Sequence, residues 1–141
     1  MRPLVLDTNV VLDLFVFRDP HMAPLRRALD AQAFDWLATD AMGDELEHVL
    51  RYPNLERCMR VGGMRGDDVL QAFTRQSRRV AAAPAVAVKC RDEDDQKFID
   101  LAVAYRALLL SKDAQVLKLR RRLAPLGVEA CACLVDSPPS I

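Results

Sequence analysis

The 141-residue sequence predicts an α/β fold: a three-layer α/β/α sandwich around a central, mostly parallel sheet. Two observations predict it. Short apolar runs alternate along the chain with stretches of helical periodicity, and the first run, residues 4–6, is continuous rather than alternating, as in strands covered on both faces. Hydrophobic residues make up 51% of the chain and charged residues 28%, which is typical of a globular domain rather than a disordered one.

The elements follow in a regular order along the chain. Strands are expected at the apolar runs over residues 4–6, 34–38, 107–110 and 128–135. Helices are expected where apolar residues recur every three or four positions, over residues 10–17, 19–33, 40–51, 67–79, 94–105 and 113–123. Pro53 is expected to end the third helix, and the glycine-containing stretch 54–66 is expected to be irregular or weakly helical.

The length fits one domain, which we expect over residues 1–135, followed by a frayed tail over residues 136–141. No apolar run approaches the roughly 18 residues of a membrane span, so no membrane association is expected. The apolar run that ends at Asp7 is too short for a secretory signal, which favours a cytoplasmic location. Basic and acidic residues number 20 each, so net charge gives no argument for nucleic-acid binding.

Two carboxylates follow predicted strands. Asp7 comes directly after the first apolar run, and Asp113 follows the run 108–110 after a two-residue turn. Ligands of open α/β sheets bind beyond the carboxyl ends of the strands, and parallel strands bring these ends to one edge. We therefore expect Asp7 and Asp113 at the same edge of the sheet.

Two further acids lie on inward-facing sides of predicted helices. Asp95 falls in the middle of the apolar stripe formed by Phe98, Ile99 and Ala102. Glu45 borders the apolar stripe of the helix over residues 40–51. A carboxylate on a core-facing stripe needs a partner, because an unpaired buried charge is costly.

Clustering of these four acids would be costly unless some of them were protonated or a cation compensated their charges. Four carboxylates within about 5 Å of one another form six repulsive pairs, which together cost on the order of 20 kcal/mol at an effective dielectric constant near 20. That exceeds the stability of a typical domain. Either the acids are not clustered, or some are protonated, or a divalent cation holds them, and an all-oxygen site suits Mg²⁺ or Mn²⁺. Taken singly, each acid also fits an ordinary helix cap, turn or solvated position.

Four motifs resemble those of the PIN-domain family. They are Leu-Asp-Thr-Asn-Val at residues 6–10, Asp-Glu-Leu-Glu-His-Val-Leu-Arg-Tyr-Pro at residues 44–53, the segment that begins Asp-Glu-Asp-Asp-Gln-Lys-Phe-Ile at residue 92, and Leu-Ser-Lys-Asp at residues 110–113. Their order and spacing resemble the prokaryotic branch described as the toxin component of a toxin–antitoxin pair. The resemblance extends over about residues 3–135.

The resemblance implies a PIN-like sandwich and metal-dependent endoribonuclease activity, the hydrolysis of RNA phosphodiester bonds. By position, the family's four acids, which are the catalytic and metal-binding residues, match Asp7, Glu45, Asp95 and Asp113. The implied cofactor is Mg²⁺ or Mn²⁺. The implied partners are an RNA substrate, an antitoxin protein whose chain enters the acidic pocket, and a second copy of the chain in a homodimer.

The sequence departs from the family pattern near the last acid. The usual Thr-Gly-Asp turn is Ser111-Lys112-Asp113, and a further acid two residues later is replaced by Gln115. The Ala-Asp pair that is common before this motif is Arg106-Ala107 here. The change at residue 115 bears on whether a second metal ion binds.

Two other functions remain open from sequence. A non-catalytic PIN-like binding or interaction module is compatible with Lys112, Gln115 and the zero net charge. An aspartate-phosphorylated α/β domain is compatible with Asp7 and Lys112 but leaves the inward-facing acids unexplained. Candidate phosphate-contacting cations are Arg51, Lys112, Lys118 and the run 120–122, and such a run is also typical of a solvated helix end.

Overall fold

The computed structural model describes residues 1–135, and the expected frayed tail at residues 136–141 lies outside the described residues. Five parallel strands form one sheet in the order β3-β2-β1-β4-β5. The strands are β1 (Arg2–Leu6), β2 (Phe34–Ala38), β3 (Arg78–Arg79), β4 (Leu108–Leu110) and β5 (Glu129–Cys131). The predicted α/β/α sandwich with a parallel sheet is confirmed.

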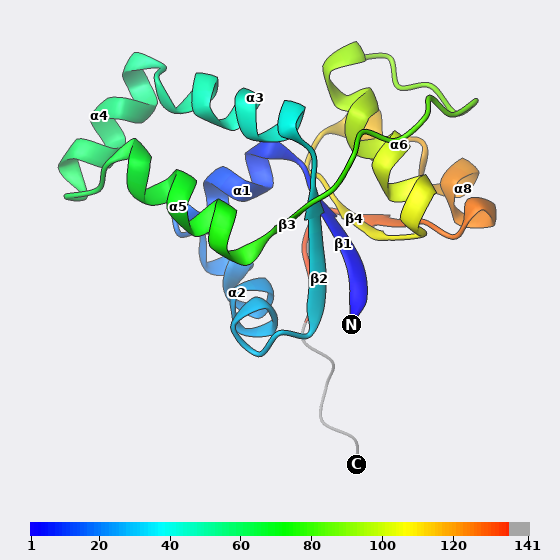
Figure 1. The fold of residues 1–141 in the computed structure, drawn as a ribbon, viewed down its shortest axis with the longest axis horizontal. Coiled ribbons are helices and arrows are strands. Elements are labelled where there is room, and N and C mark those ends of the chain that lie inside the picture. Colours follow the sequence, from blue (N-terminus) through cyan, green and yellow to red (C-terminus); the bar gives the residue numbers. More distant parts are fainter. Residues whose placement is uncertain (136–141) are drawn as a thin grey trace.

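Helices cover both faces of this sheet. Figure 1 shows the helices that precede β3 on one side and α6 and α8 on the other. The first group comprises α1 (Thr8–Phe15), α2 (Ala23–Asp30), α3 (Asp40–Leu50), α4 (Pro53–Val61) and α5 (Gly66–Gln76). The second comprises α6 (Gln96–Tyr105), α7 (Ala114–Leu117) and α8 (Arg120–Leu123). Short 3₁₀ turns are η1 (Pro20–Met22), η2 (Glu93–Asp95) and η3 (Ala124–Leu126).

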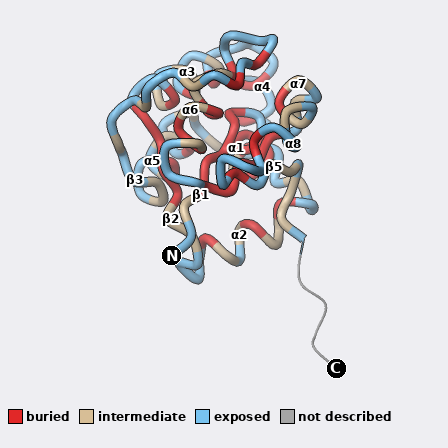
Figure 2. Tube along the Cα trace, turned by 90° about the vertical axis from the view of Figure 1, so that its right-hand side faces the viewer, coloured by how far each residue is buried: buried red, intermediate tan, exposed pale blue. Residues whose placement is uncertain are grey.

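The core lies between the sheet and these helices, and Figure 2 shows buried segments concentrated around β1 and α1. The apolar runs of the two central strands, residues 4–6 of β1 and 108–110 of β4, are buried, as their continuous apolar character predicts. Trp36 of β2 stacks on Phe15 of α1 and meets Phe73 of α5 edge-on, with ring centroids 6.1 and 5.4 Å apart. These contacts fix α1 and α5 on one face of the sheet.

The structure corrects several of the predicted elements. The stretch 54–66, expected to be irregular or weakly helical, contains a regular helix, because α4 covers Pro53–Val61 and only residues 62–65 are non-helical. A proline that cannot continue α3 is well suited to the first turn of the next helix. The last strand ends at Cys131 rather than at residue 135. The predicted helix over residues 67–79 ends at Gln76, and β3 follows it as a two-residue edge strand.

The predicted helix over residues 113–123 is divided into α7 and α8. The predicted helix over residues 94–105 begins as the turn η2, and α6 continues it. Within residues 1–135, no helix is long and apolar enough to cross a membrane.

Parallel pairing continues past the strand ends and aligns the chain segments that carry polar residues. The Asp7 amide donates to the Leu110 carbonyl (3.0 Å), and the Ser111 amide donates to the Cys131 carbonyl (3.0 Å). The exits of β1 and β4 therefore lie side by side at the carboxyl edge of the sheet, at the upper end of the strands in Figure 1.

Candidate active site

Asp7 lies where β1 becomes α1, and its side chain has only 4% of its surface exposed. One carboxylate oxygen, Oδ1, accepts the Asn9 amide (3.4 Å) and caps α1. The other, Oδ2, accepts the Ser111 hydroxyl (2.7 Å) from the neighbouring strand exit. Asp7 thus caps α1 and also belongs to a polar cluster at the sheet edge, so its role as a cap does not exclude a role in the cluster.

Asp113 occupies the equivalent place after β4 and caps α7. Its Oδ1 accepts the Gln115 amide (2.8 Å), while its own amide donates to the Ser111 hydroxyl (3.1 Å). Because Ser111 donates to Asp7 and accepts from Asp113, one buried hydroxyl links the two strand exits. The hydroxyl position that the sequence shares with the family pattern therefore has a structural role.

Three carboxylates converge most closely. Asp92, Asp95 and Asp113 each place one oxygen so that all three oxygens lie within 4.8 Å of one another. Asp95, at the junction of η2 and α6, is buried, with 8% of its surface exposed, whereas Asp92 is exposed. Asp95 Oδ2 has no hydrogen-bond partner among the described residues. Asp95 is thus a buried acid that has an unpartnered carboxylate oxygen and two other acids close to it, an arrangement that calls for a positively charged partner.

The electrostatics of these acids show their mutual repulsion. Burial, hydrogen bonding with Asp113 and the charges of Asp7, Asp113 and Asp92 raise the pKa of Asp95 from 3.8 to about 7. Burial also raises the pKa of Asp7; the Ser111 and Asn9 hydrogen bonds oppose this effect, and the charges of Glu45 and Asp113 add to it. The pKa values of Asp7 and Asp95 are therefore both raised in part by the charges of neighbouring acids, with Asp113 common to the two.

Glu45 differs from the aspartates of this region because an ammonium group contacts it. It enters the region from α3, where it is half-buried. The Thr8 hydroxyl donates to Oε2, and the Lys97 ammonium donates to Oε1 at 2.9 Å. Glu45 is thus held by α1 and α6 together.

The structure therefore brings Asp95 and Asp113 together directly and connects Asp7 to them through Ser111. Asp92 was not among the predicted site residues. Its Oδ1 caps η2 by accepting the Asp94 amide (3.0 Å), and this capping orients it toward the other acids. The sequence contained a signal for the cap, because an aspartate directly before a helical turn is typical of an N-cap, but the acidic run 92–95 does not indicate which of its members face inward.

The donor set fits a hard divalent cation. Carboxylate oxygens are the ligands that Mg²⁺ and Mn²⁺ prefer, and no sulfur or imidazole ligand belongs to the triplet. The unpartnered Asp95 Oδ2 is the atom that a cation would satisfy. Asp95, Asp113 and Asp92, with Asp7 beside them, are the residues that can hold such an ion.

Three of the six predicted phosphate-contacting cations are engaged elsewhere. Arg51, the C-cap of α3, pairs with Glu47 of that helix (2.8 Å), and Lys118 donates to Gln115 at 3.4 Å. Lys112, which stands where the family has glycine, forms an ion pair with the buried carboxylate of Asp13.

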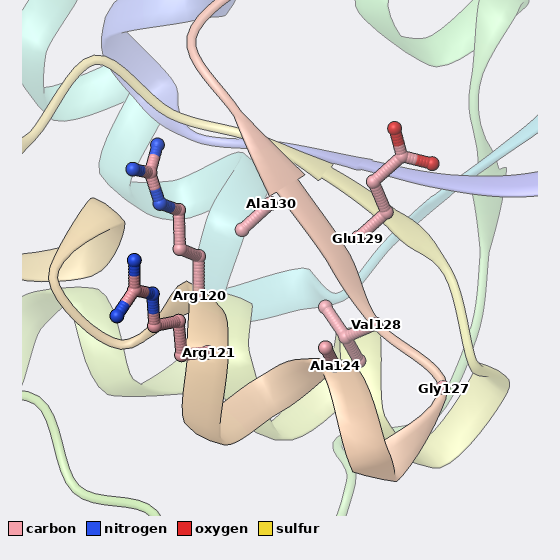
Figure 3. Close-up of a pocket in the computed structure, with 7 residues that line it drawn as sticks. All are labelled: Arg120, Arg121, Ala124, Gly127, Val128, Glu129 and Ala130. Carbon is pink, nitrogen blue, oxygen red and sulfur yellow. The ribbon is translucent and has the colours of Figure 1, made fainter.

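The arginines of α8 form no ion pair with any described residue. Figure 3 shows Arg120 and Arg121 at a cavity of about 510 Å³ beside β5, with both guanidinium groups extending from the same side of α8. This cavity shares no residue with the acidic cluster.

A second cavity borders the acids. It measures about 550 Å³ and is lined by Asp92 and its neighbours in the acidic run, together with Arg91 and Gln115. Gln115, at the position of the family's further acid, thus faces the space next to the carboxylates with a neutral amide. The arrangement leaves room for a ligand beside the triplet, with one arginine at its border.

The sequence and the fold of this chain have counterparts among known proteins. The family model described as "PIN domain" matches residues 3–114. A solved structure that is similar to this chain is the crystal structure of VapBC2 from Rickettsia felis bound to a DNA fragment from their promoter. Its matching chain has a TM-score of 0.60 and 14% sequence identity, over 91% of this chain and 98% of that one. No curated protein sequence matches significantly.

Proposed function

The chain belongs to the PIN-domain family, and from that premise we propose that it is a metal-dependent endoribonuclease that acts as the toxin of a toxin–antitoxin pair. The proposal specifies hydrolysis of RNA phosphodiester bonds with Mg²⁺ or Mn²⁺ as cofactor. PIN domains are nucleases as a family, and the four motifs that carry the resemblance all lie in the region of the acidic cluster.

One observation carries the proposal: Asp95, whose buried Oδ2 has no hydrogen-bond partner among the described residues, converges with two other acids. Without a cation, Asp95 keeps its proton below its raised pKa and carries an uncompensated charge above it, and such a buried charge costs several kcal/mol. A bound cation removes that cost and creates a reactive centre. The same observation argues against the non-catalytic module, which has no use for an unsatisfied buried acid.

In the proposed reaction, Asp95 and Asp113 hold the ion, Asp7 lies beside them and is oriented by Ser111, and Glu45 completes the site. When bound, such an ion acidifies water and stabilises the negative charge that develops on the phosphate. The water oxygen bonds to phosphorus as the P–O3′ bond breaks, so the products carry 5′-phosphate and 3′-hydroxyl ends. The Ser111 hydroxyl orients the Asp7 carboxylate and binds the backbone amide of Asp113, which links the two strand exits.

The proposed partners are RNA, an antitoxin protein and a second copy of the chain. Support for the antitoxin comes from the resemblance to the toxin branch and from the fold shared with a chain of the VapBC2 structure. The cavity beside Asp92 and Gln115 provides space next to the acids for a nucleotide or for a blocking side chain. We propose a cytoplasmic location, where RNA is available.

The experiment is cleavage of a single-stranded RNA by purified protein with MnCl₂, with EDTA as the metal-free condition. The test variant is Asp7→Asn with Asp95→Asn, which preserves the shape of both side chains and removes two charges. The matched control is Asp67→Asn, an exposed acid of α5 that belongs neither to the triplet nor to the cavity beside it. We expect cleavage by the wild type and the control, and a loss of at least about 10²-fold in the double variant.

Undiminished cleavage by the double variant would assign the activity to another site or to a contaminant. Absence of cleavage by the wild type, with no binding of Mn²⁺, would favour the non-catalytic module.

A further inference from the structure

Lys97 is the one ammonium that contacts a predicted site acid among the described residues. Its Nζ donates to Glu45 Oε1 (2.9 Å) and to the Asp94 carbonyl (2.6 Å), and it lies 4.9 Å from the centre of the Phe98 ring. The Lys97 and Glu45 side chains are each 27% exposed. These contacts join α6 to α3 and fix the ammonium at the border of the acidic cluster.

The position of Lys97 is unfavourable for a helix on its own. It lies in the first turn of α6, where the helix dipole is positive and a cation is disfavoured by about 0.3–1 kcal/mol. The attraction of Lys97 to the neighbouring acids, Glu45 above all, outweighs this unfavourable interaction with the helix dipole. Lys97 is therefore held in place by the acidic site.

The Lys97 ammonium already compensates the charge of Glu45, which leaves this acid poorly suited to bind a metal ion directly. Both of its oxygens already accept hydrogen bonds, from Thr8 and from Lys97. A pair of catalytic metal ions lies about 3.5–4 Å apart and needs carboxylates on both sides. In this chain, Glu45 is neutralised by Lys97, and the further acid of the family is the amide of Gln115.

We propose that Lys97 takes the place of a second divalent ion, so that the site binds a single ion at the aspartates and uses the ammonium as its second positive charge. This inference rests on the proposed function. An ammonium has three N–H donors, and the contacts above use two of them. The third is available to a non-bridging oxygen of the scissile phosphate, where it stabilises the negative charge of the transition state without any proton transfer.

The test is titration of metal-free protein with MnCl₂ by calorimetry. The wild type is expected to bind one Mn²⁺ per chain. Lys97→Met, which keeps the length of the stem and removes the charge, is expected to bind two, because Glu45 is released. Lys97→Arg should remain at one, as should Lys89→Met, an exposed lysine outside the site. If Lys97→Met does not fold by circular dichroism, Lys97→Gln carries the same expectation.

The kinetic measurement is the dependence of the cleavage rate on the concentration of Mn²⁺. The wild-type rate should rise hyperbolically with MnCl₂ concentration. The rate of Lys97→Met should rise sigmoidally, and at MnCl₂ concentrations that fill only the first site it should lie about 10²-fold below the wild type. Two ions in the wild type, or one in Lys97→Met, would overturn the proposal. A stoichiometry that rises from one to two without RNA cleavage by any form would support this role of Lys97 while refuting the proposed ribonuclease.

Discussion

Replacing Asp95 with asparagine should stabilise the metal-free protein at alkaline pH, although the residue is buried. In the folded state the pKa of Asp95 is raised to about 7 by burial and by the neighbouring acids, whereas its ordinary value is 3.8. The folded protein therefore keeps a proton that the unfolded chain releases. Because the folded state binds more protons between these values, the free energy of unfolding falls as pH rises through this window.

The size of the effect follows from the two pKa values. Each tenfold change in proton affinity is worth about 1.36 kcal/mol, so the rise from 3.8 to about 7 costs the metal-free protein about 4 kcal/mol above pH 7. About 3 kcal/mol of this falls between pH 5 and pH 8. An asparagine carries no charge at either pH, so Asp95→Asn avoids the loss.

Urea unfolding at pH 5 and pH 8 in EDTA measures this difference. The stability of Asp95→Asn relative to the wild type should increase by about 3 kcal/mol between the two pH values. Asp94→Asn serves as the control, since that acid is exposed and should show no such change. A variant whose stability relative to the wild type is the same at both pH values would refute the description of Asp95 as a buried, uncompensated acid.

Three further predictions concern metal binding, the turn after β4 and the α8 arginines. Mn²⁺ should raise the Tm of the wild type and leave that of Asp95→Asn nearly unchanged in a thermal-shift assay; equal shifts would remove the metal-site argument. Lys112→Ala should lower the free energy of unfolding by about 1–3 kcal/mol in urea, because it leaves the buried carboxylate of Asp13 unpaired, and Asp13→Asn should recover much of the loss. A Lys112→Ala protein as stable as the wild type would contradict this. Serine at both Arg120 and Arg121 should reduce the salt dependence of RNA binding, measured by fluorescence anisotropy in EDTA, by about 1.4 in the log–log slope; an unchanged slope would exclude phosphate contacts there.

The central strands and the strand-end acids could be predicted from sequence because each depends on local information. A continuous apolar run such as residues 108–110 is typical of a covered parallel strand, and an acid after such a run must lie at the sheet edge. Asp7 and Asp113 are therefore placed by topology alone. Each of the two aspartates also caps the helix that follows it, and it uses one carboxylate oxygen, Oδ1, for this contact.

The elements that could not be predicted depend on contacts between distant residues. The strand β3 consists of Arg78 and Arg79, which have no apolar signature; it exists because β2 offers an unpaired edge. The Glu45–Lys97 contact joins residues 52 positions apart. The sequence therefore predicts that Glu45 lies near the site, but not that an ammonium neutralises it.

The most direct test of the proposed site is a crystal structure of the protein grown with MnCl₂, with anomalous diffraction used to locate manganese. We predict one anomalous peak per chain, coordinated by Asp95 and Asp113, with Asp92 or Asp7 as a further ligand. A peak elsewhere, or a cluster that holds no manganese at millimolar concentration, would contradict the assignment of this carboxylate edge as the catalytic centre.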